Sequence, residues 1–147
     1  MHRLRERVHG TRLVGRPADR VGLRIGPGGL MNDLRTFGLL FETLAIRDLR
    51  VYADALMGEV RHYHDASGLE CDAVVYLRDG TYGLVEIKIG GQPLIDKGAS
   101  TLVKLAAKID TGKMPKPSFL TVLTAIGEYA YRREDGVYVV PIGCLKP

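Results

Sequence analysis

Two stretches of the chain carry apolar residues at the three- and four-residue steps of an amphipathic helix. Asn32 or Asp33 precedes the first stretch, and either side chain can cap a helix N-terminus. Gly58 follows the same stretch, and Gly90-Gly91 breaks the chain before the second. The pattern therefore predicts helices over about residues 33–56 and 94–109.

Short segments rich in Val, Tyr and Ile lie between and after these helices, bounded by turn residues as strands are. Three follow the first helix in succession, and their two short connections predict antiparallel hairpins. A strongly apolar strand follows the second helix, and the chain closes with a hairpin. The predicted strands cover residues 59–64, 69–77, 83–89, 118–125, 129–132 and 137–140. This order predicts an α/β domain with a mixed central sheet.

Two of the predicted strands place charged groups inside otherwise apolar segments. Because strand side chains alternate between faces, Glu86 and Lys88 share one face of their strand. By the same alternation Asp72 shares a face with Val74, and Cys71 points the other way. If the strands pair, Asp72 lies beside Glu86 and Lys88. Three accounts are open: a solvated surface patch, a structural Lys–Asp bridge, or a Mg²⁺ site built from hard carboxylate oxygens.

Glu42, in the first predicted helix, adds a third carboxylate. Glu42 therefore lies on or beside the apolar stripe, because its neighbours along the helix are apolar. These neighbours are Leu39, Ala45, Ile46 and Leu49. A carboxylate in such a position needs a cation or a hydrogen-bond donor. This favours a metal site over a surface patch, with a glutamate at the edge of the stripe as the alternative.

These residues carry a resemblance to a known group of enzymes. Asp72, thirteen further residues and Glu86-Ile87-Lys88 resemble the D-x(n)-E-x-K pattern of the PD-(D/E)XK nuclease superfamily. The predicted order of elements resembles that superfamily's restriction-endonuclease-like core, and Glu42 matches its first-helix acid. Segments 37–42, 68–75 and 85–88 are also similar to the uncharacterised domain at the C-terminus of many prokaryotic AAA-type ATPases.

The resemblance implies a PD-(D/E)XK nuclease-like domain over residues 30–147 that hydrolyses phosphodiester bonds of DNA. It assigns Asp72, Glu86 and Glu42 to Mg²⁺ or Mn²⁺, and Lys88 to the attacking water or the transition-state charge. The alternative is a catalytically weak or inactive nuclease-fold module that interacts with or regulates an ATPase. A weaker option is a homodimer formed through the terminal hairpin. The sequence contains no P-loop motif, G-x-x-x-x-G-K-[ST]. We therefore expect a stand-alone or truncated form of the ATPase C-terminal domain, which does not hydrolyse ATP by that route.

Positive charge is concentrated at the start of the chain. Residues 1–30 carry seven arginines and two acids, a net charge of +5, whereas residues 31–147 carry 14 basic and 15 acidic side chains, a net charge of −1. We interpret residues 1–29 as an arginine-rich leader or linker remnant. It is either a solvated tail or a basic arm that neutralises phosphates.

The remaining features favour a cytoplasmic protein without a membrane segment. The two cysteines, Cys71 and Cys144, form no disulfide or metal pattern, and no apolar run is long enough to span a bilayer. The start of the chain lacks the apolar region of a signal peptide. His62 and His64 share a strand face that we expect to be polar surface, and Ser67 has no evident base partner in the sequence.

Overall fold

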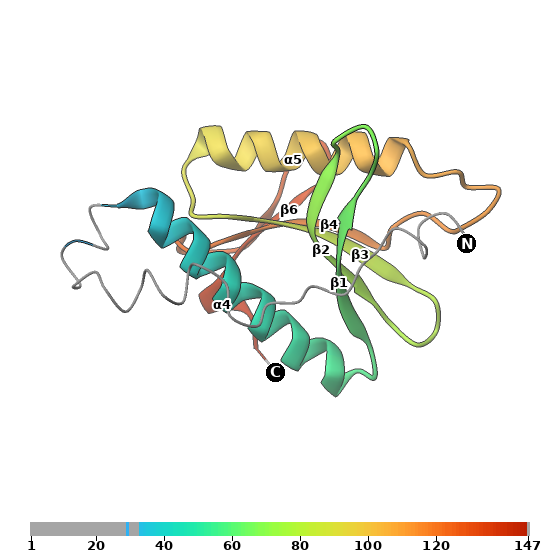
Figure 1. Ribbon diagram of the computed structural model, residues 1–147, viewed down its shortest axis with the longest axis horizontal. Coiled ribbons are helices and arrows are strands. Elements are labelled where there is room, and N and C mark those ends of the chain that lie inside the picture. The colour runs from blue at the N-terminus through green and yellow to red at the C-terminus, as the bar shows by residue number, and fades with distance from the viewer. Residues whose placement is uncertain (1–28, 30–32, 147) are drawn as a thin grey trace.

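A computed structural model describes Gly29 and residues 33–146, so the expectations for residues 1–28 lie outside the described residues. The described residues form a six-stranded mixed sheet with the order β1-β2-β3-β4-β6-β5. Helices α4 and α5 cover its opposite faces (Figure 1). This confirms the prediction of a mixed α/β domain. No helix in the described part is long and apolar enough to cross a membrane.

Helix α4 (Leu34–Ala55) begins where the sequence predicted. The Asp33 side chain caps it by accepting the Thr36 N–H at 3.1 Å, which satisfies one of the free donors of the first turn. At the other end the Gly58 N–H donates to the Ala53 carbonyl at 2.7 Å, and the chain turns into the sheet.

Strands β1 (Glu59–His64), β2 (Glu70–Tyr76) and β3 (Tyr82–Lys88) form the expected antiparallel hairpins. Helix α5 (Gln92–Ala107) then carries the chain over the sheet to β4 (Phe119–Thr124), which runs parallel to β3. Strand β6 (Tyr138–Pro141) is parallel to β4, and the short strand β5 (Tyr131–Arg132) pairs antiparallel with β6 at the sheet edge. A 3₁₀ turn, η1 (Ile142–Cys144), follows β6.

Each helix packs on its own apolar core. On the α5 side, Ala99 and Leu102 pack with Val74 and Leu84. On the α4 side, Phe41 packs with strand residues whose side chains point to the opposite face of the sheet. Strand β3 is covered on both faces, and all its residues except Lys88 are buried. Because β3, β4 and β6 are parallel, their carboxyl ends meet at one end of the sheet, where α5 begins.

Strand β2 departs from regular alternation at Asp72. Between the paired residues Arg61–Val74 and Tyr63–Cys71, β2 has two residues where β1 has one. This two-against-one arrangement is a β-bulge, which bends a strand and redirects its side chains. As a result Cys71 and Val74 pack in the same α5-side core. The prediction that these two residues face opposite ways is therefore wrong, because it assumed an unbroken period of two.

Candidate functional site

The structure brings Asp72, Glu86 and Lys88 together at the carboxyl end of β3. The Lys88 Nζ atom lies 2.7 Å from Glu86 Oε2 and 3.4 Å from Asp72 Oδ2. The three side chains are largely withdrawn from water, with 7% of Glu86, 19% of Asp72 and 21% of Lys88 exposed. A single ammonium group therefore bridges two carboxylates in a partly desolvated place.

The backbone holds the Asp72 carboxylate in this position. Regular pairing between β2 and β3 stops at Ala73 and Val85. Beyond that pair, Asp72 Oδ2 accepts the Ile87 N–H at 2.7 Å. The Asp72 N–H in turn donates to Glu86 Oε1 at 3.4 Å. A side-chain oxygen of Asp72 thus takes the place of a backbone acceptor between β2 and β3, which orients the carboxylate.

Helix α5 closes over the cluster at Gly98. A Cβ atom at this position would lie 3.4 Å from Glu86 Cβ and 3.5 Å from Lys88 Cε. The missing side chain lets the helix backbone approach β3 and shield Glu86 from solvent. Sequence reasoning did not identify Gly98 as part of the site, although a lone glycine inside a helical pattern was a visible signal.

Burial and charge oppose each other in this cluster. Desolvation, followed by the nearby Asp72 carboxylate, raises the pKa of Glu86 to about 7, and the Lys88 ammonium counteracts only part of this rise. Burial also acts to lower the pKa of Lys88, but the two carboxylates outweigh it and raise that pKa. With both acids ionised the cluster carries one excess negative charge, so it favours the uptake of a proton or a further cation.

The donor set suits a magnesium ion. Mg²⁺ prefers hard oxygen ligands and is commonly held by one or two carboxylates, with waters and substrate phosphates completing its shell. Asp72 and Glu86 supply two such carboxylates. Among the described residues, however, no group of three or more His, Cys, Asp and Glu side chains is placed to hold a metal ion. A fit to Mg²⁺ therefore rests on these two acids.

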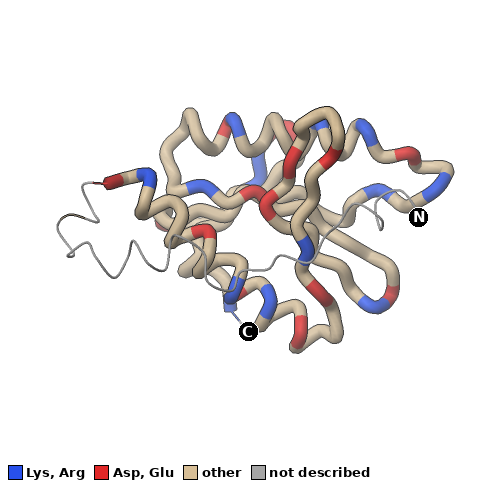
Figure 2. Tube along the Cα trace, in the orientation of Figure 1, with Lys and Arg blue, Asp and Glu red and all other residues tan. Residues whose placement is uncertain are grey.

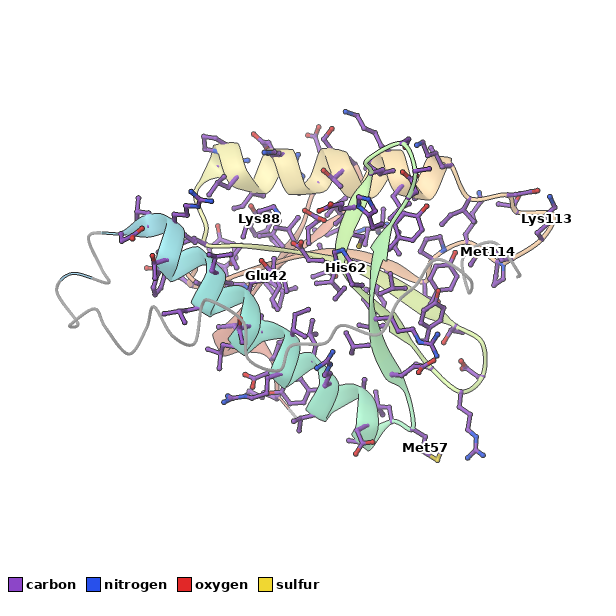
Figure 3. The ribbon with its side chains drawn as sticks, viewed as in Figure 1. Glu42, Met57, His62, Lys88, Lys113 and Met114 are labelled. Atoms are coloured by element: carbon purple, nitrogen blue, oxygen red, sulfur yellow. The ribbon has the colours of Figure 1, made fainter. Side chains whose placement is uncertain are left out.

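Glu42 lies at the same end of the sheet, in the opposite layer. A Cβ atom at Gly38 of α4 would lie 3.3 Å from Ile89 Cδ1, next to Lys88. Glu42 follows one turn later on the same helix face, about 5.4 Å along the axis. Figure 3 shows Glu42 on α4 and Lys88 at the end of β3. Its half-buried position agrees with the expected edge of the apolar stripe, and its role as a metal ligand stays a prediction.

The other polar candidates lie elsewhere. His64 Nδ1 is 2.8 Å from the exposed Glu70 carboxylate, a surface pair. Ser67 has partners that the sequence did not indicate: its Oγ donates to Asp65 Oδ1 at 2.6 Å and accepts from Lys108 Nζ at 2.8 Å. Because Lys108 also forms an ion pair with Asp65 at 3.5 Å, this cluster joins the β1–β2 turn to the end of α5.

The fold and the cluster define a mixed α/β domain with a carboxylate–lysine site at the end of its central strand. The chain belongs to a family described as a domain of unknown function, DUF4143, whose model matches residues 37–145. The matched range contains Glu42 and the three residues of the cluster. No curated protein and no solved structure matches the chain.

Proposed function

We propose that this chain is a metal-dependent nuclease-type domain of the PD-(D/E)XK kind, which hydrolyses phosphodiester bonds of DNA. The observation that carries this proposal is the contact of one lysine with two carboxylates at the desolvated end of the central strand. Ion pairs that only stabilise a fold gain little from such burial, because desolvation offsets their attraction. The cluster is therefore better explained by chemistry.

Asp72 and Glu86 are the residues that would hold the metal ion. When bound, Mg²⁺ or Mn²⁺ would supply an activated water and neutralise charge on the phosphate. The Ile87 N–H anchors one oxygen of Asp72 and leaves the other for a ligand. Glu42, on the opposite layer, would accept hydrogen bonds from water in the site.

Lys88 would act on the phosphate. Its ammonium carries three N–H donors, and in the described structure the nitrogen contacts one oxygen of each acid. Its raised pKa keeps it protonated at neutral pH. It can therefore orient the attacking water or stabilise negative charge that develops on the phosphorus centre. Such stabilisation is strong in a site from which water is largely excluded.

A cleavage assay with matched variants tests this function. The full chain would be incubated with single- and double-stranded DNA in Mg²⁺ or Mn²⁺, beside Asp72→Ala and Lys88→Ala. We expect both variants to lose at least about 100-fold in rate, the usual order for a group that stabilises transition-state charge. The control is Asp110→Asn, which removes an exposed acid outside the cluster and should leave the rate unchanged. Cleavage that persists in both site variants would show that another protein is responsible.

A second candidate is a nuclease-fold module that binds or regulates a partner, such as an ATPase, without catalysis. It is favoured by the observation that the Lys88 ammonium already compensates charge on both carboxylates without a metal ion. Isothermal calorimetry with Mg²⁺ and Mn²⁺ separates the two candidates. A nuclease must bind the ion through Asp72 and Glu86, whereas an inactive module would show neither metal binding nor cleavage.

A further inference from the structure

The C-terminal hairpin exposes an unusual set of aromatic side chains. Tyr129 is 68% exposed, Tyr131 is 37% exposed and Tyr138 is 41% exposed. The rings of Tyr129 and Tyr131 form a pair, with centroids 5.9 Å apart and planes tilted by 56°. Ile126 precedes them in the same segment and is 69% exposed. Large apolar side chains gathered on a surface usually mark a binding site.

An arginine accompanies these rings. The Arg132 guanidinium lies 5.6 Å from the centroid of the Tyr138 ring, and the two residues are register partners across β5 and β6. Tyr131 pairs with Val139, which packs in the α5-side core, so Tyr131 and Arg132 point to opposite sides of the sheet edge. The edge strand therefore offers aromatic surface on both of its sides.

This surface begins next to the carboxylate–lysine cluster. Where the chain leaves β4, the Ala125 and Ile126 N–H groups donate to the Ile89 carbonyl at 3.0 and 3.1 Å. The chain then runs along the carboxyl ends of the strands toward β5. Three strand spacings of about 4.8 Å separate β3 from β5, so roughly 14 Å lie between the cluster and the edge.

The charges around the hairpin indicate what kind of ligand fits. Arg133 Nη1 lies 2.6 Å from Asp96, and Arg133 Nε lies 3.1 Å from Asp135, so these two acids are already paired. Glu128 and Glu134 are exposed nearby, and Figure 2 shows Lys and Arg positions interspersed with Asp and Glu along the trace. For the nucleic acid of the proposed function, affinity at this hairpin would therefore come mainly from stacking on the rings, which requires bases whose faces are free.

We infer that Tyr129 and Tyr131 form a stacking platform for unpaired bases of a single-stranded nucleic acid that reaches the Lys88 cluster. This inference rests on the proposed function and specifies its substrate class. In a duplex the base faces are covered by their neighbours, whereas in a single strand they can stack on tyrosine. The platform would hold the strand at the sheet edge while a phosphate lies at the cluster.

Binding measured without metal ions tests this inference separately from cleavage. The full chain in EDTA would be titrated into a fluorescent single-stranded oligonucleotide of about 15 nucleotides and into the matched duplex, with anisotropy as the readout. We expect tighter binding of the single strand. Tyr129→Ala and Tyr131→Ala should each weaken it by about five-fold or more, the lower limit for loss of one base–aromatic stack. Tyr129→Phe should bind as the wild type does.

Two further variants serve as controls. Lys113→Gln removes an exposed cation in the loop after α5, at the far end of the molecule from Lys88 in Figure 3, and should leave affinity unchanged. Asp54→Asn, on the exposed face of α4, should also bind normally, because it lies outside both the cluster and the platform. Circular dichroism would confirm that each variant is folded. Tyr129 is the more exposed of the first two tyrosines, so Tyr129→Ala suffices if Tyr131→Ala misfolds.

The outcomes separate this inference from the proposed function. Absence of single-strand binding, equal affinity in Tyr129→Ala and wild type, or preference for the duplex would overturn the platform. So would sedimentation data in which Tyr129→Ala dissociates a dimer, since the rings would then form an interface between copies. Single-strand binding without cleavage in Mg²⁺ would instead refute the nuclease and leave the platform standing.

Discussion

Lys88 is the residue on which the electrostatics of the cluster depend. Its ammonium contacts both carboxylates, and Glu86, the more buried of the two, has a pKa raised to about 7 mainly by desolvation. An acid whose pKa is higher in the folded state than in the unfolded state costs stability when it is ionised. This cost is absent at low pH and develops as the pH rises through the folded-state pKa. Lys88 offsets part of this cost at neutral pH.

Replacement of Lys88 by methionine should therefore destabilise the protein in a pH-dependent way. We expect the free energy of unfolding to fall by about 1–3 kcal/mol at pH 8, where two carboxylates would remain without a cation. The loss should be smaller at pH 5, because Glu86 is then protonated. Urea denaturation in EDTA at both pH values measures the difference.

The matched control for this prediction is Lys104→Met, which removes an exposed lysine from α5. It should change stability by less than about 0.5 kcal/mol at either pH. If Lys88→Met costs the same free energy at pH 5 and pH 8, the carboxylates do not depend on Lys88 for charge compensation.

Helix α5 determines how well the cluster is shielded. Besides Glu86 and Lys88, a Cβ atom at Gly98 would meet the buried Val122 Cγ2 at 3.3 Å. We predict that Gly98→Leu lowers the free energy of unfolding by about 1–3 kcal/mol, because overpacking displaces the helix. Gly98→Ala should cost less, since higher helix propensity offsets its tight contacts. Urea unfolding curves compare the two variants, and a Gly98→Leu protein as stable as wild type would show that α5 does not approach so closely.

The β1–β2 hairpin depends on Asp65. Its side chain accepts the Ser67 hydroxyl, the Ser67 N–H at 2.8 Å and the Leu69 N–H at 3.0 Å, and these bonds, led by the hydroxyl, hold the pKa of Asp65 well below its ordinary value. An acid whose pKa is lower in the folded state than in the unfolded state stabilises the fold above its unfolded-state pKa. This stabilisation is lost as the pH falls through the folded-state pKa.

Asp65→Asn should accordingly lower the melting temperature at pH 7, because an amide cannot replace the charged acceptor of these bonds. The gap between variant and wild type should narrow as the pH falls from 5 toward 2. Thermal melts followed by circular dichroism across this range measure the gap, with Asp54→Asn on the exposed face of α4 as the control. A gap that is constant with pH would contradict an ionised Asp65 in the turn.

At the scale of the whole molecule, charge is distributed unevenly. Residues 31–147 carry a net charge of −1, whereas residues 1–30 carry +5. Any phosphate contacts made by Arg3, Arg5 and Arg7 would release counterions and make binding dependent on salt. We predict that replacing these three arginines with glutamine reduces the slope of log affinity against log salt by about 2 for single-stranded DNA. Anisotropy titrations over a range of salt concentrations measure the slope, and an unchanged slope would mean that phosphates contact the body of the protein instead.

Local patterns were sufficient to predict most of the architecture. The spacing of apolar residues located α4, α5 and all six strands to within a few residues, and Asp33 marked the start of α4 through its capping side chain. The alternation within β3 placed Glu86 and Lys88 on one face, which the structure confirms because both lie against Gly98 of α5. These features depend on neighbouring residues along the chain, so a single sequence determines them.

Long-range contacts decided the rest. The bulge that redirects Asp72 exists only because β1 and β2 pair in a particular register, and the Asp72–Ile87 bond requires β3 to stop pairing at that point. The sequence likewise did not show that α5 approaches β3 at Gly98, nor that Lys108 reaches Ser67. The sequence by itself determined which residues belong to the cluster and on which elements they lie. Tertiary structure alone decided their distances, burial and charge balance, because these depend on how strands register and how closely a helix packs.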